Sequence, residues 1–367
     1  MKVALVHDYL KEIGGAERVL MALHEIFPDA PVYTAYKFPK YWGHYKDELE
    51  KWDIRESWGR WLPFLPKWLS YYTILSPLFF STMDLSEYDL VIISATGGYF
   101  PNGVKVGPKT KVITYCHTPP RFLYGYETAT QARHKWYWKV QSAIANHILR
   151  MVDFRWAQKP TVFVANSKNV ANRVRKFYRR DAVVVYPPIS KTSPQPLSSI
   201  QERGDYYLIV SRIVGTKNVE LAVEAARKYK FKLKIAGKMI GGSRPDFGGV
   251  EYLGEVSEEE KYRLMAGAKA FLALSKDEDF GITPVESMMC GTPVIAYRAG
   301  GYLETVVDGK TGMFFEELTP EGLYEAIGRV GRIRLDRTYI KKWAGKFSKE
   351  NFKKQMLRLV DAGIARN

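Results

Sequence analysis

Short apolar runs, each followed by a polar or glycine-containing turn and then by a helical pattern, recur along most of the chain. Such runs are typical of buried strands, and their alternation with helices predicts an α/β protein with parallel sheets. The first series of predicted strands comprises Lys2–His7, Pro31–Tyr36, Tyr88–Ser94, Lys111–Cys116, Thr161–Ala165 and Ala182–Pro188. The second series comprises Tyr206–Ser211, Phe231–Ala236, Val250–Val256, Ala270–Leu274 and Pro293–Ala296.

A segment rich in Ser, Pro and Gln separates the two series, and this composition is typical of a linker. At 367 residues the chain also suits two domains rather than one. We therefore expect an N-terminal domain over residues 1–188, a linker over 189–205 and a C-terminal domain over 206–338. From Thr319 onward the chain has a helical pattern to its end.

The charge is strongly basic, with 55 Lys and Arg against 39 Asp and Glu and a formal net charge of +16. This excess indicates a partner rich in negative charge: nucleic acid, an anionic membrane surface or a phosphorylated substrate. A basic nucleic-acid-binding protein is one alternative, because +16 would give counterion-driven affinity. That alternative leaves unexplained the glycine turn, carboxylates and strand-end residues described below.

The expected location is a reducing cytoplasm, because Cys116 and Cys290 form neither a disulfide framework nor a metal-ligand spacing. The chain opens directly on a predicted strand, so we expect no signal peptide. The longest apolar candidate, Leu69–Phe80, is short and interrupted by Pro77, so it does not predict a membrane span.

Two segments leave peripheral membrane binding open. Trp58–Phe80 is unusually aromatic and contains Arg60 and Lys67, a combination typical of a membrane interface. The alternative is a helical hairpin packed on the first sheet. The predicted helix Val170–Tyr178 lies in a basic run from Arg173 to Arg180, which could face an acidic membrane or simply be a solvated surface.

The stretch Ser275–Pro293 contains the strongest chemical signal. It follows a predicted buried strand and opens a helix, with Pro284 in the first turn, where a missing N–H is tolerated. The backbone N–H groups of Gly281–Thr283 are then expected at a helix N-terminus, where unpaired donors and the helix dipole attract phosphate.

Two carboxylates, Glu278 and Glu286, flank this predicted phosphate site. Carboxylates repel phosphate, so we interpret them as acceptors of hydrogen bonds from hydroxyl groups, and phosphate with hydroxyls describes a nucleotide sugar. The alternative is that they only complement the helix dipole. Asp277–Asp279 resembles a short acidic metal motif, but no His or Cys lies nearby, and we expect no metal site.

Three other candidates follow predicted strands. Gly14 and Gly15 form a tight turn that would let the backbone approach a ligand, although a plain turn is an equal alternative. His117 lies where ligands bind in an α/β sheet, or else it caps the loop. Arg212 and Lys217 lie five residues apart on a strand-to-helix loop and fit a diphosphate clamp.

Glu278 to Glu286 with the embedded Phe-Gly resembles the Glu-x7-Glu signature of retaining glycosyltransferases of family four. Arg212 and Lys217 match the family's Arg-x4-Lys, and the run Tyr115–Arg121 resembles a block of a mannosyltransferase branch that builds cell-surface polysaccharides. The resemblance spans nearly the whole chain. It is strong in the second domain, good around His117 and weak in the aromatic segment.

The resemblance implies the GT-B fold, two Rossmann-like domains facing a cleft, with Tyr339–Asn367 packing back onto the first domain. It implies metal-independent transfer of a sugar from a nucleotide diphosphate to an acceptor hydroxyl, with retention, and no cofactor other than that donor. GDP-mannose is the preferred donor on the likeness of Tyr115–Arg121, with a lipid-linked or saccharide acceptor at the inner face of the membrane. A UDP-sugar donor is the alternative, and a nucleotide-sugar epimerase of the same fold is less favoured.

The roles of individual residues are carried over from the family. His117 would contact the transferred sugar, Glu278 its hydroxyls and Glu286 the ribose. The diphosphate would be held by Arg212, Lys217 and the amides of Gly281, Ile282 and Thr283, and the remaining donor contacts are Gly14, Gly15, Gly254, Val256 and Phe280. Glu17 and Arg121 are weaker candidates for binding the acceptor. No nucleophile for a two-carboxylate retaining scheme is identified.

Overall fold

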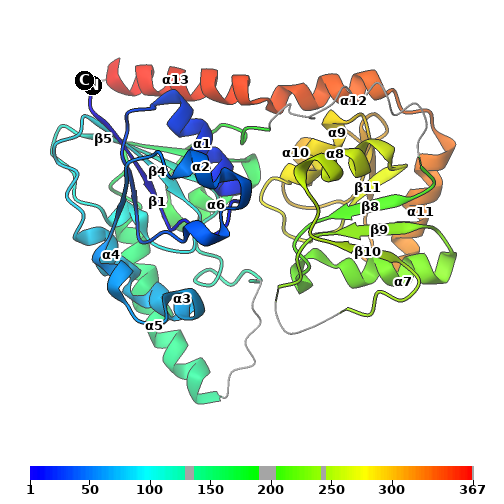
Figure 1. Cartoon of the computed structure of the whole chain (residues 1–367), viewed down its shortest axis with the longest axis horizontal. Helices are drawn as coiled ribbons and strands as arrows, with labels where there is room; N and C mark the ends of the chain where they lie inside the picture. Colours follow the sequence, from blue (N-terminus) through cyan, green and yellow to red (C-terminus); the bar gives the residue numbers. More distant parts are fainter. Residues whose placement is uncertain (129–135, 190–203, 241–244, 366–367) are drawn as a thin grey trace. The chain divides into compact units, whose positions relative to one another are not determined.

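The computed structural model describes residues 1–128, 136–189, 204–240 and 245–365 (Figure 1). These divide into two compact units, each described here by itself. Unit 1 holds the described residues of Met1–Glu127, Ala132–Pro188 and Glu350–Asn367, and unit 2 holds those of Ile189–Lys349 together with Thr128. Most of the predicted linker lies outside the described residues.

Unit 1 contains a seven-stranded, fully parallel sheet in the order β3-β2-β1-β4-β5-β6-β7. The strands are β1 (Val3–His7), β2 (Val32–Thr34), β3 (Ile54–Glu56), β4 (Leu90–Ala95), β5 (Lys111–Cys116), β6 (Val162–Ala165) and β7 (Ala182–Val184). Each strand of the first predicted series is present. The short edge strand β3 was not predicted, because Ile-Arg-Glu contains a single apolar residue and no apolar run.

Helices cover both faces of this sheet. The helices of unit 1 are α1 (Gly15–Ile26), α2 (Lys46–Leu49), α3 (Leu65–Tyr72), α4 (Ser76–Ser81), α5 (Trp136–Trp156), α6 (Lys168–Tyr178) and α13 (Lys349–Ala365). Its 3-10 turns are η1 (Pro39–Tyr41), η2 (Gly43–Tyr45), η3 (Trp58–Trp61), η4 (Thr73–Leu75) and η5 (Pro101–Gly103).

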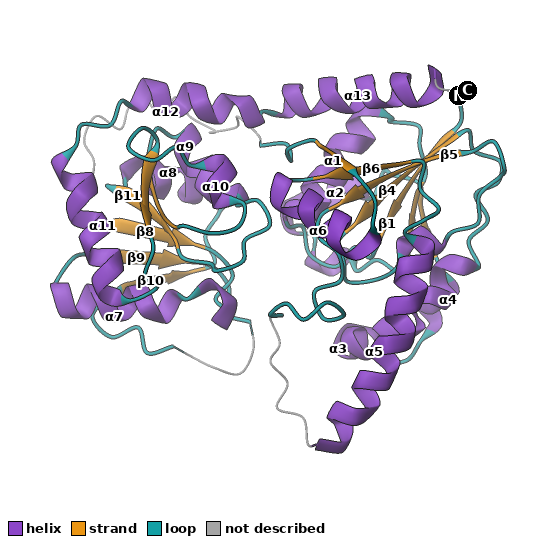
Figure 2. Ribbon diagram, turned by 180° about the vertical axis from the view of Figure 1, so that it is seen from behind, coloured by secondary structure: helices purple, strands orange, loops and turns teal. Residues whose placement is uncertain are grey.

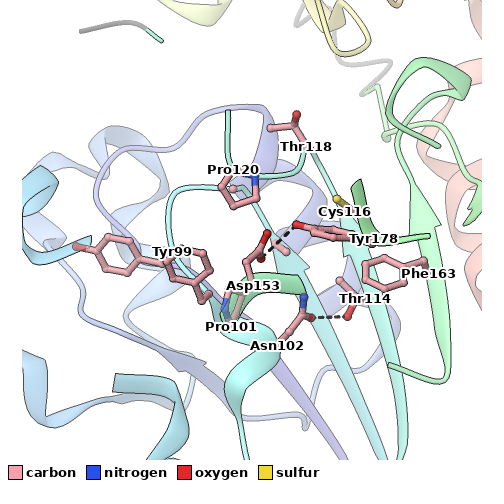
Figure 3. Close-up of a pocket in the computed structure, with 13 residues that line it drawn as sticks. Tyr99, Pro101, Asn102, Thr114, Cys116, Thr118, Pro120, Asp153, Phe163 and Tyr178 are labelled. Carbon is pink, nitrogen blue, oxygen red and sulfur yellow. Dashed lines mark hydrogen bonds between the residues drawn. The ribbon is translucent and has the colours of Figure 1, made fainter. Parts of the chain in front are cut away.

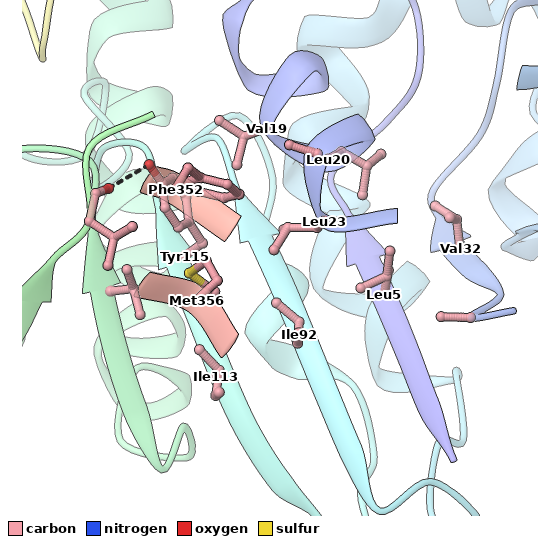
Figure 4. Close-up of a cluster of buried hydrophobic side chains, with 14 of the residues drawn as sticks. Leu5, Val19, Leu20, Leu23, Val32, Ile92, Ile113, Tyr115, Phe352 and Met356 are labelled. Carbon is pink, nitrogen blue, oxygen red and sulfur yellow. Dashed lines mark hydrogen bonds between the residues drawn. The ribbon is translucent and has the colours of Figure 1, made fainter. Parts of the chain in front are cut away.

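Successive side chains of a strand point to opposite faces of the sheet, so the apolar residues of these strands form two separate clusters. On one face, Leu5, Ile92 and Ile113 pack with α1 and α13 (Figure 4). On the other face, Val91 and Ile93 belong to a cluster that includes side chains of α4. This matters for the site. Residues at the strand ends that lie on the same face as Leu5 and Ile92 point toward α1.

The C-terminal segment divides between the units. From Glu350 onward it belongs to unit 1, where Phe352 and Met356 of α13 are buried and the Phe352 ring lies 5.8 Å from the ring of Tyr115. The preceding residues belong to unit 2, where α12 packs on α9 and Trp343 Nε1 donates to the Thr305 carbonyl at 2.8 Å. The expected boundary at Tyr339 is therefore too early, because the apolar face of α12 (Arg337–Ala344) is buried in unit 2.

Unit 2 contains a six-stranded parallel sheet in the order β10-β9-β8-β11-β12-β13. The strands are β8 (Tyr207–Val210), β9 (Leu233–Ala236), β10 (Glu251–Gly254), β11 (Ala270–Ala273), β12 (Val294–Tyr297) and β13 (Gly312–Phe315). All five predicted strands are present. β13 was not predicted.

Helix α7 lies on one side of this sheet, and α8, α9 and α12 lie on the other, as both views show (Figures 1 and 2). The helices of unit 2 are α7 (Val219–Tyr229), α8 (Glu258–Gly267), α9 (Ile282–Met289), α10 (Tyr302–Thr305), α11 (Pro320–Arg332) and α12. The 3-10 turns are η7 (Gly215–Lys217) and η8 (Gly345–Phe347).

The aromatic segment of unit 1 has one buried and one exposed side. Leu65, Phe79 and Phe80 are buried against the sheet, which agrees with a packed helical hairpin. Several large apolar side chains of the same segment are exposed: Trp58, Trp61, Phe64, Trp68, Tyr71, Ile74 and Leu78. In the described part of the chain, no helix has both the length and the apolar character needed to span a membrane.

Candidate functional site

Each sheet has a switch point, where successive strands begin to be added on the opposite side. In unit 1 it lies between β1 and β4, and in unit 2 between β8 and β11. Open α/β sheets bind ligands beyond the carboxyl ends of the strands at this point. Residues that follow those strands, together with neighbouring strand ends, include most of the candidates singled out in the sequence.

In unit 2, the loop after β11 leads into α9 as the sequence predicted. Gly281 precedes the helix with φ of 91°, and a Cβ there would meet the Tyr302 ring at 2.9 Å, so both conformation and space require glycine. Pro284 lies in the first turn, and Ile282 and Thr283 are partly exposed. The backbone N–H groups of this turn therefore begin a helix beside the switch point.

Lys217 and Glu278 form an ion pair, with Nζ 2.5 Å from Oε2. The hydroxyl of Tyr302 donates to the same carboxylate oxygen at 3.3 Å. The Lys217 and Glu278 side chains are 26% and 19% exposed, so solvent still reaches the pair. The sequence suggested separate roles for the two residues, whereas the structure makes them direct partners whose charges neutralise each other.

The loop carrying Glu278 is held by two glycines, Gly300 and Gly301. Gly301 N donates to the Glu278 carbonyl at 2.8 Å. A Cβ at Gly300 would meet that carbonyl oxygen at 2.5 Å, and one at Gly301 would meet the Phe280 Cα at 2.4 Å. The turn before α10 therefore approaches the loop too closely for any side chain.

Phe280 and Glu286 are more enclosed than their predicted roles suggested. The Phe280 side chain is 2% exposed and its ring lies 5.4 Å from that of Phe347, so a ligand would meet its backbone rather than its ring. Glu286 is 1% exposed, with its Oε1 3.1 Å from Lys261 Nζ and 3.4 Å from the Tyr262 hydroxyl. The sequence gave no signal for Lys261, because it lies 25 residues away on α8.

The other predicted donor contacts of unit 2 lie at strand ends. Arg212 follows β8 and is exposed. Gly254 ends β10 with φ of 68°, and its carbonyl accepts a 2.7 Å hydrogen bond from Gly237 N. Val256 is partly exposed and precedes Ser257, the N-cap of α8.

In unit 1, the glycine turn begins α1 without requiring an unusual backbone conformation. Gly14 has φ of −114° and is the N-cap residue of α1, which starts at Gly15. Its N–H donates to Glu17 Oε2 at 2.8 Å. The other oxygen of Glu17 lies 3.4 Å from His7 Nε2, so this carboxylate joins the helix start to the end of β1.

His117 lies directly after β5 and contacts the neighbouring strand end. Its Nε2 is 3.0 Å from Ser94 Oγ, and the same oxygen is 3.1 Å from His7 Nδ1. Burial lowers the pKa of His117 to about 3, so its imidazole is neutral at pH 7. Burial alone would raise the pKa of Glu17, but its hydrogen bonds with His7 and with the backbone N–H of Gly14 hold that pKa below its usual value.

The glycine-rich segment after β4 is held by Asp8. Asp8 is 1% exposed and accepts hydrogen bonds from Thr96 Oγ1 at 2.6 Å and from the backbone N–H of Tyr99 at 2.8 Å. Gly97 has φ of 80°, and a Cβ there would meet the Thr118 carbonyl at 2.6 Å. The loops that follow β4 and β5 therefore approach each other closely.

Arg173 corrects our interpretation of the basic helix. It is 4% exposed, donates to Thr118 Oγ1 at 3.0 Å and lies 4.5 Å from the centre of the Tyr126 ring. It supports the loop after His117 rather than a solvated face. Arg121 is partly exposed in the same loop, and Asn166 Nδ2 donates to the His117 carbonyl at 2.9 Å.

A small cavity in unit 1 contains none of the predicted site residues (Figure 3). Its most polar wall is Asp153 of α5, which accepts hydrogen bonds from Tyr124 at 2.8 Å and Tyr178 at 3.2 Å. Burial raises the pKa of Asp153 to about 7. Separately, no group of three or more His, Cys, Asp or Glu that could hold a metal ion occurs among the described residues.

Two family models match consecutive parts of the chain. The model described as Glycosyltransferase Family 4 matches residues 13–192, and the model described as Glycosyl transferases group 1 matches residues 191–346. Among curated proteins, alpha-1,3/1,6-mannosyltransferase ALG2 of Homo sapiens is 26% identical over 412 residues, covering 95% of this chain and 93% of that protein. An uncharacterized glycosyltransferase of Methanocaldococcus jannaschii is 29% identical over 197 residues, covering 51% of this chain and 53% of that protein.

Solved structures share the whole fold at low sequence identity. HepE of Anabaena in complex with UDP and glucose has a TM-score of 0.67 and 17% identity, covering 98% of this chain and 99% of that one. Sucrose-phosphate synthase from Thermosynechococcus elongatus has a TM-score of 0.66 and 16% identity, with 100% of both chains covered. The two Rossmann-like units thus have the architecture of the GT-B fold, as the sequence predicted.

Proposed function

We propose that this chain, a glycosyltransferase of the GT-B fold, transfers mannose from GDP-mannose to a hydroxyl group of a lipid-linked or saccharide acceptor. The product would be a cell-surface polysaccharide or glycolipid, formed with retention at the anomeric carbon. The observation that carries the proposal is the Lys217–Glu278 pair beside the N-terminus of α9, at the switch point of unit 2.

Sugar transfer requires cationic groups at the diphosphate and hydrogen-bond acceptors at the sugar hydroxyls. The bond between the anomeric carbon and the diphosphate breaks, so negative charge develops on the leaving oxygen. Lys217, Arg212 and the N–H groups that begin α9 would stabilise that charge. Glu278 would accept hydrogen bonds from sugar hydroxyls, because Lys217 and Tyr302 already hold its carboxylate away from a role as nucleophile. His117 would contact the transferred sugar.

Binding of nucleotides tests this proposal directly. A ligand that binds only the folded protein raises the unfolding midpoint, so we would measure thermal shifts with GDP, UDP and ADP. GDP is expected to raise the midpoint of the wild type and not that of Lys217→Ala. Lys228→Ala is a matched control, because Lys228 also forms an ion pair in unit 2, but on the exposed surface with Glu321. If no nucleotide shifts the wild type, the proposal fails.

The donor base is the part most open to revision by this experiment. GDP-mannose is supported by the run Tyr115–Arg121 and by the mannosyltransferase name of the ALG2 relatives. A UDP-sugar is supported by the bound UDP and glucose named for HepE. A shift with UDP alone would keep the sugar transfer and replace the donor.

We also propose that the transfer needs no metal ion. Its support is that Arg212, Lys217 and the start of α9 offer positive charge where a metal would otherwise neutralise the diphosphate. Transfer should therefore continue at an unchanged rate in excess EDTA. A loss of rate that Mg²⁺ or Mn²⁺ restores would overturn this inference.

We further propose that unit 1 binds an anionic membrane surface, where a lipid-linked acceptor would be presented. Trp61, Phe64 and Tyr71 are 78%, 67% and 69% exposed, and the Arg60 guanidinium lies 4.7 Å from the centre of the Trp61 ring. Exposed aromatics beside a cation suit the headgroup region of a bilayer. Arg173 is excluded from this surface because it is buried.

Co-sedimentation with vesicles tests the membrane proposal. The wild type should pellet with vesicles that contain phosphatidylglycerol, and the triple variant W61S, F64S and Y71S should remain in the supernatant. Leu303→Ser is the control, because Leu303 is 53% exposed on unit 2. Equal pelleting of the triple variant and the wild type would remove this surface from the proposal.

A further inference from the structure

Four side chains of unit 1 form one hydrogen-bonded row at its switch point. Glu17 Oε1 is 3.4 Å from His7 Nε2, His7 Nδ1 is 3.1 Å from Ser94 Oγ, and Ser94 Oγ is 3.0 Å from His117 Nε2. His7 and Ser94 are both 0% exposed, and His117 is partly exposed. The row therefore connects the start of α1 to His117, the histidine of the row that solvent reaches.

The fold itself sets this geometry. The parallel register of β1 and β4 places His7 beside Ser94. Both continue the alternation of Leu5 and Ile92, so both point to the face that α1 covers, where Glu17 lies. The backbone of His117 is fixed on both sides, because its N–H donates to the Ala95 carbonyl at 2.9 Å and its carbonyl accepts from Asn166.

Each contact in the row uses one proton, and the donors can be assigned in order. The Glu17 carboxylate has no proton to give and already accepts from Gly14 N on its other oxygen. His7 must therefore donate from Nε2, which leaves the Nδ1 of its neutral ring as an acceptor. The single hydroxyl proton of Ser94 goes to that nitrogen, so Ser94 Oγ accepts the proton of His117 Nε2. Nδ1 of the neutral His117 then carries a lone pair.

The competing arrangement requires a charged His7. With both of its nitrogens protonated, His7 would donate to Ser94, Ser94 would donate to His117 Nε2, and His117 would carry its proton on Nδ1. That arrangement buries an imidazolium with no exposed surface, with Glu17 at 3.4 Å. Burying a charge is costly unless it is closely paired and hydrogen-bonded. With His7 neutral, the only charge in the row is that of the Glu17 carboxylate, which is 15% exposed and accepts hydrogen bonds from Gly14 N and His7 Nε2.

We propose that Glu17, His7 and Ser94 are positioning residues that hold His117 in the Nε2-protonated form, with Nδ1 as a hydrogen-bond acceptor. If the ligand is the one given by the proposed function, Nδ1 accepts a hydrogen bond from a hydroxyl group of the transferred sugar. Glu17 then acts through His117 and does not itself bind the acceptor, which was the weaker prediction from the sequence.

Nitrogen-15 NMR of the full chain labelled at histidine tests the row without any nucleotide. His117 is assigned by the loss of its signals in His117→Gln. In the wild type we expect protonated Nε2 with a slowly exchanging N–H, and unprotonated Nδ1. In Ser94→Ala the Nε2 proton should lose its protection from exchange. A protonated Nδ1 in the wild type, or identical His117 signals in Ser94→Ala, would overturn the proposal.

Two further variants separate the row from general disturbance. Glu17→Gln keeps an oxygen that can accept from His7, whereas Glu17→Ala removes it, so only the alanine variant should shift the His117 resonances. Thr114→Val removes another fully buried hydroxyl of this sheet, one that donates to Asn102 rather than to the row. It should leave the His117 signals unchanged. If Glu17→Ala leaves them unchanged too, Glu17 is not part of the row.

Kinetics supply the functional half of the test. Ser94→Ala should lower kcat by about three- to tenfold, the equivalent of one net hydrogen bond, and Thr114→Val should not. The two possible failures are distinguishable. A protein that shows no sugar transfer but has the expected His117 tautomer refutes the proposed function alone, whereas normal kcat in Ser94→Ala with an altered tautomer refutes the assignment of the sugar hydroxyl.

Discussion

In unit 1, β1 ends in His7 and Ser94 is the next-to-last residue of β4, and both side chains are fully buried and hydrogen-bonded. In unit 2, the corresponding strands are followed by Arg212, which is exposed, and by the loop of Glu278, which solvent reaches. The two sheets have the same kind of reversal in strand order. The topology therefore fixes where a site lies, while the residues that follow the strands decide whether it offers neutral hydrogen bonds or charge.

Charge in unit 2 is itself divided between a buried pair and a solvent-reached pair. Lys261 and Glu286 are 7% and 1% exposed, whereas Lys217 and Glu278 are several times more exposed. Loss of one partner should therefore affect stability at the first pair and ligand binding at the second. The first two of the four predictions below separate these effects.

The largest expected effect on stability is that of Lys261→Met. It leaves the Glu286 carboxylate buried without its cation, which should lower the free energy of unfolding by about 3–5 kcal/mol. Urea denaturation followed by hydrogen exchange in α8 and α9 measures the change. Lys228→Met, at the exposed pair with Glu321, should leave exchange in both helices as it is in the wild type. Equal effects of the two variants would show that burial does not distinguish these pairs.

The second prediction concerns catalysis. Lys217→Ala should lower kcat/KM by about 10²–10³-fold, because it removes a cation from the oxygen that gains charge in the transition state. Its free energy of unfolding should change far less than that of Lys261→Met, since the Lys217 side chain is already 26% exposed. A large loss of stability with unchanged kcat/KM would reverse the roles that we assign to the two pairs.

The third prediction uses the carboxyl group of unit 1 that is buried in the cavity. Burial raises the pKa of Asp153 to about 7 in the folded protein, above the value of about 4 of an unfolded chain. Its contribution to stability is therefore fully present below about pH 4 and is lost as the pH rises through 7. Between pH 5 and pH 8 the wild type should lose about 2–3 kcal/mol relative to Asp153→Asn.

Tryptophan fluorescence is a suitable probe for that comparison. Of the nine tryptophans, Trp343 alone lies within Ile189–Lys349, so the signal reports mainly on unit 1. The difference between the wild type and the variant isolates Asp153 from other groups, among them Asp8, whose pKa burial also raises. Parallel pH profiles for the two proteins would refute the assignment.

Much of the fold was predictable because its signals are local. The bounds of β5 agree with those expected, and the predicted helix Val170–Tyr178 is present as α6. The pattern of apolar residues and turns specifies such elements within a few neighbouring positions. β3 was missed because its sequence, Ile-Arg-Glu, contains a single apolar residue and therefore no apolar run.

The residues of the candidate site could be predicted from the sequence, but the residues with which they form ion pairs and hydrogen bonds could not. Glu278 and Lys217 were each identified, but their ion pair joins residues 61 positions apart, and that of Lys261 with Glu286 joins two helices. His7 and Ser94 had no signal at all, because each looks like an ordinary polar end of a strand. Only the register of β1 against β4 brings them together. Which strand lies beside which is a property of the whole sheet.

The smallest predicted effects compare one helix cap from each unit. Ser167 and Ser257 each accept a hydrogen bond from the N–H three residues later, at 3.0 and 3.1 Å. Ser257→Ala should lower the free energy of unfolding by about 1 kcal/mol, the usual contribution of an N-cap. Ser167→Ala should cost about 2 kcal/mol, because Ser167 is 0% exposed and also donates to Asn166 Oδ1 at 3.0 Å.

The same variant connects the cap to the candidate site. Asn166 holds the His117 carbonyl, so Ser167→Ala should also shift the backbone amide resonances around His117, and Ser257→Ala should not. Chemical denaturation and amide NMR of the two variants measure both effects. Equal costs and no change near His117 would mean that the cap of α6 stabilises its helix alone. A larger cost with a local shift would show that in unit 1, unlike unit 2, helix capping and the site share one hydrogen-bond network.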